Sequence, residues 1–175
     1  PEFHELLVRW FEYGCFCPVM RLHGYRWPLQ PQYGTTGGAT CVSGAPNEVW
    51  SYTDQVCEIL SDYLRLRERM LPYITELMEE AHEKGTPVMR PLFYDFPEDK
   101  ESWNVETEYM FGPKVLVKPI TDADARETDV YLPGGASWTN AWTGETFEGG
   151  QKVHVAAPIE QIPLFTRDGY KLPMK

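Results

Sequence analysis

The pattern of apolar residues changes near Pro97, and this change most limits what the chain can fold into. Before Pro97, apolar residues recur every three or four positions, which predicts amphipathic helices. After it, short apolar runs alternate with glycine and proline, which predicts short β-strands. The runs cover residues 109–111, 115–120, 128–132, 138–147, 153–156 and 162–166. We therefore predict an α/β region at residues 1–97 and a small antiparallel β-sandwich domain at residues 98–175.

The α/β region begins with a helix followed by a short apolar run. The helical stripe of residues 3–14 ends at a glycine, and residues 15–22 have the length and composition of a buried strand. Residues 25–52 then lack any apolar period. A loop of this length is usually functional or mobile, so we expect either a loop that covers a site at the strand end or a mobile surface excursion.

The clearest helix of the sequence covers residues 53–84. Thr53 is a suitable N-cap, and Gly85 is a suitable C-terminal stop. Pro72 should kink this helix, because proline lacks the amide donor and crowds the preceding turn. Residues 88–96 are again predicted to be extended.

A helix, a short apolar strand and a glycine turn are typical of an α/β barrel or a doubly wound sheet. One or two strands with two helices cannot close a barrel, and an open sheet edge promotes aggregation. We therefore expect this chain to be part of a larger protein.

Charge and hydropathy exclude several classes of partner. The net charge is −10 and no basic run occurs, which makes nucleic acid and anionic lipid poor partners. No stretch approaches eighteen consecutive apolar residues, so no membrane span is expected. The first ten residues do not have the pattern of a signal peptide.

The cysteines and histidines do not have the spacing of a metal site. Cys15 and Cys17 are two residues apart, which matches neither a metal finger nor a redox pair. We expect buried, reduced thiols at all four cysteines, and the cytoplasm is the favoured compartment. No metal or other cofactor is predicted.

His23 is the main candidate for a functional residue. It follows the predicted strand at residues 15–22, and ligands of parallel α/β folds bind at the carboxyl ends of the strands. An imidazole at this place can hydrogen-bond a sugar hydroxyl, although an ordinary surface histidine is the alternative. Arg21 would need a carboxylate partner if it lay in a buried strand, and the same argument applies to Arg90.

The acidic residues of the sequence do not suggest a catalytic pair. Most of the 26 Asp and Glu residues lie in solvated runs. Asp95 comes closest to a strand-end acid, but we interpret it as a turn residue. No serine nucleophile elbow, phosphate loop or dinucleotide fingerprint occurs. The six Trp and ten Tyr indicate a large aromatic core or, alternatively, aromatic faces that stack on sugars.

Several motifs together resemble glycoside hydrolase family 31, which includes α-glucosidases and α-xylosidases. ELLVRWFEYGCFCPVMRLHG (residues 5–24) resembles the segment that brings strand eight into the family's (β/α)8 barrel, and YLRLRERMLPYI (63–74) resembles its final helix. GTPVMRPLFYDFP (85–97) resembles the exit strand. EYMFGPKVLVKPI and DVYLPGGASWTNAWTGE resemble the proximal C-terminal β-domain. The resemblance covers nearly the whole chain, apart from the loop at residues 30–46.

The resemblance implies a retaining α-glycosidase without a cofactor, in which one Asp attacks the anomeric carbon and a second acts as acid and base. In the family both Asp residues precede the segment that this chain matches, so no catalytic residue is assigned here. The family's sugar-contacting His corresponds to His23, and a neighbouring Arg corresponds to Arg21. RLHG followed by YRWP is closer to α-xylosidase-like members. The Gly/Thr-rich loop at residues 34–44 has no counterpart in the family pattern.

We therefore predict a barrel terminus and β-domain of an enzyme that cleaves α-xylosides or α-glucosides. The expected partners are a glycoside or oligosaccharide substrate and the missing N-terminal part of the same enzyme, and the chain alone should be inactive. The alternative is a non-catalytic carbohydrate-binding or scaffold module with Trp138 and Trp142 as its aromatic platform.

Overall fold

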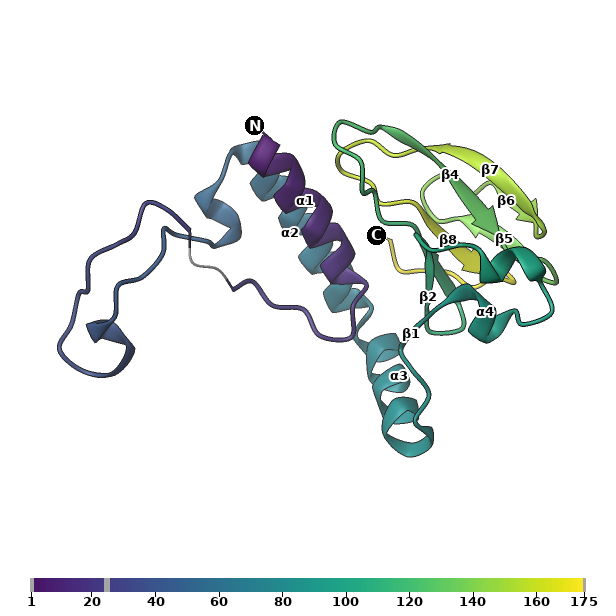
Figure 1. Ribbon diagram of the computed structural model, residues 1–175, viewed down its shortest axis with the longest axis horizontal. Helices are drawn as coiled ribbons and strands as arrows, with labels where there is room; N and C mark the ends of the chain where they lie inside the picture. Colours follow the sequence, from purple (N-terminus) through teal and green to yellow (C-terminus); the bar gives the residue numbers. More distant parts are fainter. Residues whose placement is uncertain (1, 24–25, 175) are drawn as a thin grey trace.

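The computed structural model describes residues 2–23 and 26–174. Its main helices are α1 (Glu2–Cys15), α2 (Asp54–Arg69) and α3 (Leu71–Lys84), and α1 and α2 lie side by side (Figure 1). A short helix α4 (Leu92–Asp95) follows the first strand. The strands are β1 (Met89–Arg90), β2 (Tyr109–Phe111), β3 (Val115–Val117), β4 (Glu127–Leu132), β5 (Ser137–Asn140), β6 (Thr146–Glu148), β7 (Gln151–Ala156) and β8 (Leu164–Arg167). Short 3-10 turns occur at Gly37–Thr40, Val49–Ser51 and Lys100–Trp103.

The described strands form two antiparallel sheets. Six strands pair in the order β1-β2-β3-β8-β5-β6, and β4 pairs with β7 in a second sheet. The hairpin predicted around Thr143 and Gly144 is the β5–β6 pair, in which Trp138 lies opposite Phe147. The prediction of helices followed by an antiparallel β-domain is confirmed, although several strands are shorter than the apolar runs.

Each face of the larger sheet packs on a different layer. Phe111, Val115 and Val117 belong to the core beneath the helices, whereas Met110 and Leu116 belong to the core shared with β4 and β7. Successive side chains of a strand point to opposite faces, so β2 and β3 alternate between these two cores. Burial on both faces explains why the strands are continuously apolar.

The ends of the long helical segment follow the sequence signals. The Thr53 hydroxyl accepts a hydrogen bond from the Val56 amide, and Gly85 ends α3 with a left-handed φ of 71°. The predicted kink is a break at Met70, because α3 starts at Leu71 with Pro72 in its first turn. The three predictions for this segment are confirmed.

The long loop between α1 and α2 projects away from the helices (Figure 1). Its two arms are joined by the Gln30 amide, which donates to the Ser43 carbonyl at 2.7 Å, and by the Ala45 amide, which donates to the Arg26 carbonyl at 2.8 Å. The loop is therefore an irregular hairpin whose two arms are hydrogen-bonded to each other.

One predicted strand is wrong and another is much shorter than predicted. Helix α1 extends to Cys15, and residues 16–23 form a turn, bends and irregular chain without a strand partner among the described residues. An apolar run becomes a strand only where another strand offers its backbone groups, and no strand of the described part of the chain lies beside this segment. Residues 88–96 contain only the two-residue strand β1, after which Leu92–Asp95 turn into α4.

The cysteines differ in burial. Cys15 is buried, Cys17 and Cys57 are half-buried, and Cys41 is exposed on the long loop; all four are unpaired. The prediction of buried thiols is confirmed for Cys15, holds only in part for Cys17 and Cys57, and is wrong for Cys41, because no described hydrophobic side chain of residues 26–44 packs against either core. No described helix is both long and apolar enough to cross a membrane.

Candidate functional site

The two predicted sugar-binding residues lie in the exposed segment that follows α1. The Arg21 guanidinium donates a hydrogen bond to His23 Nδ1 over 3.4 Å. Because a guanidinium can only donate, Nδ1 accepts and the ring proton resides on Nε2, which remains available to donate to a ligand oxygen. Arg21 does not lie in a buried strand as expected, and its partner is His23 rather than a carboxylate.

His23 lines an open groove of about 410 Å³. The groove lies between residues 22–23, the end of the long loop and helix α2. Its lining residues are Leu22, His23, Asn47, Glu48, Val49, Trp50 and Leu64. The end of the loop therefore forms one wall of the groove that contains His23. Trp50 is 73% exposed, so most of its indole faces solvent.

Neighbouring side chains hold the polar groups of this wall. The Tyr52 hydroxyl donates a hydrogen bond to Asn47 Oδ1, and the Ser51 hydroxyl donates to Glu48 Oε2 at 3.0 Å. Hydrogen bonds from its own backbone amide and from Ser51 hold the pKa of Glu48 below its usual value. Glu48 is therefore an acceptor near neutral pH and not a general acid.

The groove has the composition of a site for a polyhydroxylated ligand. It combines an exposed indole with an imidazole, an amide and a carboxylate, and these groups can stack on a sugar ring and hydrogen-bond its hydroxyls. Glu48 is the sole acid among the seven described lining residues. Glycoside cleavage by the usual mechanisms needs two carboxyl groups, so the groove can bind a sugar but lacks the groups to cleave it.

Sequence reasoning missed Asn47, Glu48 and Trp50 as individual site residues. The high tryptophan content and the expectation of a loop over a site were the available signals. Neither signal selects one of the six tryptophans, because twenty-six residues separate His23 from Trp50 and only the fold brings them together.

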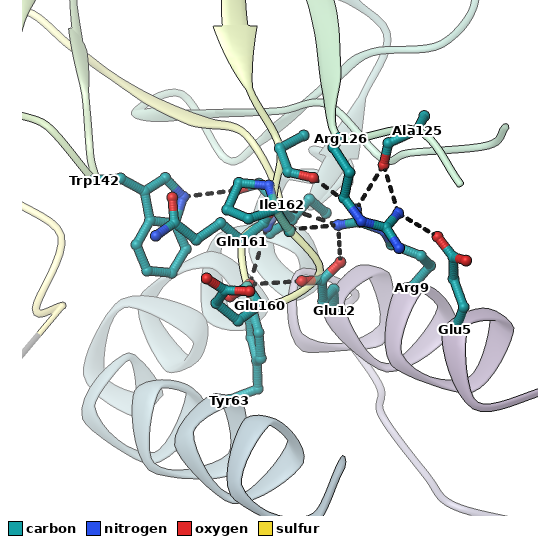
Figure 2. A network of polar contacts seen from close by, with 12 residues as sticks. Glu5, Arg9, Glu12, Tyr63, Ala125, Arg126, Trp142, Glu160, Gln161 and Ile162 are labelled. Atoms are coloured by element: carbon teal, nitrogen blue, oxygen red, sulfur yellow. Dashed lines mark hydrogen bonds and ion pairs between the residues drawn. The ribbon is translucent and has the colours of Figure 1, made fainter. Parts of the chain in front are cut away.

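A second group of titratable residues lies buried between the helices and the β-domain (Figure 2). Its centre is Arg9, which donates to Glu12 Oε2 at 3.1 Å and is 7% exposed. The same guanidinium donates to four backbone carbonyls of the β-domain, at distances from 2.7 to 3.3 Å. These carbonyls belong to Ala125, Ala157, Pro158 and Gln161.

Tyr63 of α2 completes this network. Its hydroxyl accepts the Ile162 amide at 3.0 Å and lies 3.1 Å from both Glu12 Oε1 and the Glu160 carbonyl oxygen. Glu12 is fully buried, and the network joins α1, α2 and the loop before β8. We interpret it as a structural connection between the two regions, because Arg9 and Glu12 have no access to a ligand.

The pH dependence of stability should depend on Glu12. Burial raises the pKa of Glu12 from 4.5 to about 8 despite the nearby Arg9 charge. The folded state therefore binds a proton that the unfolded chain has lost, and stability should decrease as pH rises between these two values. We expect Glu12→Gln to reduce this slope in urea unfolding measured from about pH 5 to about pH 8.

The slope should not vanish in this variant, because burial also raises the pKa of Glu108, to about 7. Glu108→Gln should therefore remove a further part of the slope. Equal slopes in the wild-type chain and in Glu12→Gln would show that Glu12 is ionised in the folded state throughout this range.

The predicted aromatic platform of the β-domain does not exist. Trp138 is fully buried, and its indole nitrogen donates to the Pro133 carbonyl at 2.9 Å. Trp142 is half-buried at the edge of a cleft of about 630 Å³, and its indole nitrogen donates to the Ile162 carbonyl at 2.7 Å. Both indoles therefore serve mainly in packing, which removes the basis of a two-ring sugar platform.

Arg90 and Asp95 have structural roles. Arg90 is 5% exposed, forms an ion pair with Asp95 at 3.1 Å, and donates from Nε to the Pro87 carbonyl at 2.7 Å. Asp95 ends the short helix α4, so it is a turn residue rather than a catalytic acid. Within residues 2–23 and 26–174, no cluster of three His, Cys, Asp or Glu side chains could hold a metal ion.

Two family models match the chain in order. Residues 1–77 match the glycosyl hydrolases family 31 TIM-barrel domain, and residues 85–172 match the glycosyl hydrolase family 31 C-terminal domain. These matches confirm the predicted fold class, a barrel terminus followed by a β-domain. The predicted boundary at residue 97 remains a prediction.

Individual proteins show the same similarity. The chain is 36% identical to an alpha-xylosidase of Saccharolobus solfataricus over 97% of its length and 36% identical to alpha-glucosidase 2 of Bacillus thermoamyloliquefaciens over 94%. A crystal structure of a family 31 alpha-xylosidase from a soil metagenome, complexed with xylose, matches 98% of the chain with 46% identity and a TM-score of 0.91. The chain spans about a fifth of the two curated relatives, at 21% and 19%, and 26% of the crystallised chain.

Proposed function

The chain belongs to glycosyl hydrolase family 31, and on that premise we propose that it supplies a sugar-contacting part of an enzyme that cleaves α-linked xylosides or glucosides. In this proposal His23 binds the sugar, Arg21 orients its imidazole, and the catalytic acids belong to a part of the enzyme outside this chain. The observation that carries the proposal is the open groove that His23 lines together with the exposed indole of Trp50.

His23 would act by hydrogen bonding rather than by proton transfer in the bond-breaking step. With Nδ1 occupied by Arg21, its Nε2 proton can be donated to a sugar hydroxyl. Such a bond accelerates the reaction only if it strengthens as the oxocarbenium-like transition state forms. The Asp nucleophile and the Asp acid/base of the retaining mechanism have no counterpart in the groove.

An exposed apolar face of α1 supports a partner made of further barrel elements. Phe3, Leu6 and Trp10 are 49%, 55% and 64% exposed, and their spacing places them on one side of the helix. A contiguous apolar face of this kind normally packs against another element. We propose that the remaining barrel of a family 31 enzyme covers it.

The test of this proposal is an exchange of segments with the soil-metagenome alpha-xylosidase. Replacing the matching quarter of that enzyme by this chain supplies the missing barrel, and we expect the resulting protein to hydrolyse an aryl α-xyloside. The 175-residue chain alone should show no turnover. His23→Ala in the exchanged enzyme should lower kcat/KM about 10- to 100-fold, the range for one or two lost hydrogen bonds.

His82→Ala is the matched control, because His82 is exposed on α3 and does not line the groove. It should leave kcat/KM unchanged. An exchanged enzyme that folds but does not turn over aryl α-xyloside or α-glucoside would refute the proposal. Turnover by the chain alone would refute the absence of catalytic acids, and an unaffected His23→Ala variant would remove His23 from the site.

A further inference from the structure

Four consecutive backbone carbonyls, starting at the last residue of α1, are each bound by a side chain from a distant part of the sequence. Arg67 of α2 donates to the carbonyls of Cys15 at 2.7 Å, Cys17 at 2.9 Å and Pro18 at 3.1 Å. The Tyr109 hydroxyl of β2 donates to the remaining carbonyl, that of Phe16, at 2.9 Å. We call residues 15–18 with these two side chains the carbonyl clasp.

The clasp does more than complete the end of a helix. Helix α1 ends at Cys15, so only the first of the four carbonyls belongs to it. Capping would satisfy that carbonyl, whereas the other three lie beyond the helix. Charge-assisted hydrogen bonds from the planar Arg67 guanidinium fix the positions of its three acceptor carbonyls relative to one another.

Packing contacts also hold this segment. Phe16 is fully buried, and its ring meets the Phe111 ring edge-on with 6.1 Å between centroids. The Cys15 thiol lies 3.6 Å from the Tyr63 carbonyl oxygen. Residues 15–18 are thus fixed to α2 and to the β-domain at once, and His23 follows only five residues after Pro18.

We propose that Arg67 and Tyr109 are positioning residues for His23. They determine the direction in which the chain leaves α1, and so they place the exposed Arg21–His23 pair at the groove. This inference rests on the proposed function of His23. It extends that function, because the β-domain would then help to determine the geometry of the sugar site through Tyr109. Neither residue touches the groove itself.

A double-mutant cycle in the exchanged enzyme tests this inference. Arg67→Met should lower kcat/KM about tenfold, and Tyr109→Phe, which removes one hydrogen bond, about threefold. In the His23→Ala background both substitutions should change kcat/KM less than about twofold, because a residue that acts through His23 has nothing left to position. Arg65→Met, an exposed arginine on the same helix, is the control and should have no effect.

The outcomes separate the inference from the proposed function. Effects of Arg67→Met and Tyr109→Phe that persist in full in the His23→Ala background would show a general structural role and overturn the inference, while the proposed function would stand. If His23→Ala itself had no effect, both would fall. Tyr109→Phe keeps the test decisive if Arg67→Met does not fold.

A measurement on the 175-residue chain tests the same inference without turnover. Amide hydrogen exchange at Phe16 and Cys17, which donate to the Tyr13 and Gly14 carbonyls at 3.0 and 3.1 Å, should become at least about tenfold faster in Arg67→Met and remain unchanged in Arg65→Met. Unchanged exchange in Arg67→Met would show that the clasp does not hold this segment and would overturn the inference, whatever the exchanged enzyme does.

Discussion

Replacing Arg9 by methionine is expected to lower the free energy of unfolding by about 3–5 kcal/mol, because it leaves several buried oxygen atoms without their hydrogen-bond donor. The substitution removes the donor to Glu12 Oε2 and to the Ala157 and Gln161 carbonyls, whereas the Pro158 carbonyl keeps a backbone amide and the Ala125 carbonyl keeps Arg126 as donor. Methionine fills much of the arginine volume, so the loss reports on polar contacts rather than on a cavity. Urea unfolding of the 175-residue chain measures it.

Arg126→Met is the matched control for this prediction. Arg126 lies next to the network and forms an ion pair with Glu5, but its side chain is 45% exposed (Figure 2). An exposed pair contributes at most about 1 kcal/mol, so the control should be several-fold milder. Similar losses in the two variants would show that Arg9 is not the main connection between helices and β-domain.

Gly112→Ala is expected to lower the free energy of unfolding by about 2–5 kcal/mol, because two independent costs add. Gly112 has a φ of 59°, which is strained for any residue with a Cβ atom. The new Cβ would also lie 2.3 Å from the Tyr73 hydroxyl oxygen and 2.5 Å from Leu77 Cδ2. Tyr73 cannot withdraw easily, since its hydroxyl donates to the Phe111 carbonyl at 2.8 Å.

Gly144→Ala separates these two costs. Gly144 also has a positive φ, 77°, but no atom lies within 4 Å of the position of its Cβ. In the same unfolding experiment, Gly144→Ala should therefore lower the free energy of unfolding by only about 1–2 kcal/mol, the cost of the backbone conformation. If both alanine variants were equally stable, the close packing of α3 against the β2–β3 turn would contribute nothing.

The elements that the sequence predicted well are those set by local chemistry. Thr53 caps α2, Pro72 interrupts the long helix and Gly85 ends α3, as the residue types require. The strands of the β-domain were also recognisable, because short apolar runs between glycines and prolines have few other solutions. Signals of this kind act within a few residues, so they can be read without knowing the fold.

The wrong predictions concern residues whose state depends on distant partners. Residues 15–22 are apolar enough for a strand, yet among the described residues they meet side-chain donors of Arg67 and Tyr109 instead of a neighbouring strand. Trp138 was a candidate for stacking on sugar, but it packs between the two sheets. Composition cannot distinguish a core indole from an exposed one, because both have the same hydropathy.

The residues of the candidate site also fall into those that the sequence indicated and those that only the fold brought together. The sequence by itself indicated His23 and Arg21, and the order of its motifs indicated the family that the two family models confirm. Only the tertiary structure decided that Asn47, Glu48 and Trp50 share a groove with His23, and that Arg9 and Arg67 bind backbone carbonyls far away in sequence. The physical reason is that caps and turns are contacts between near neighbours, whereas a groove or a buried ion network exists only after remote segments have packed together.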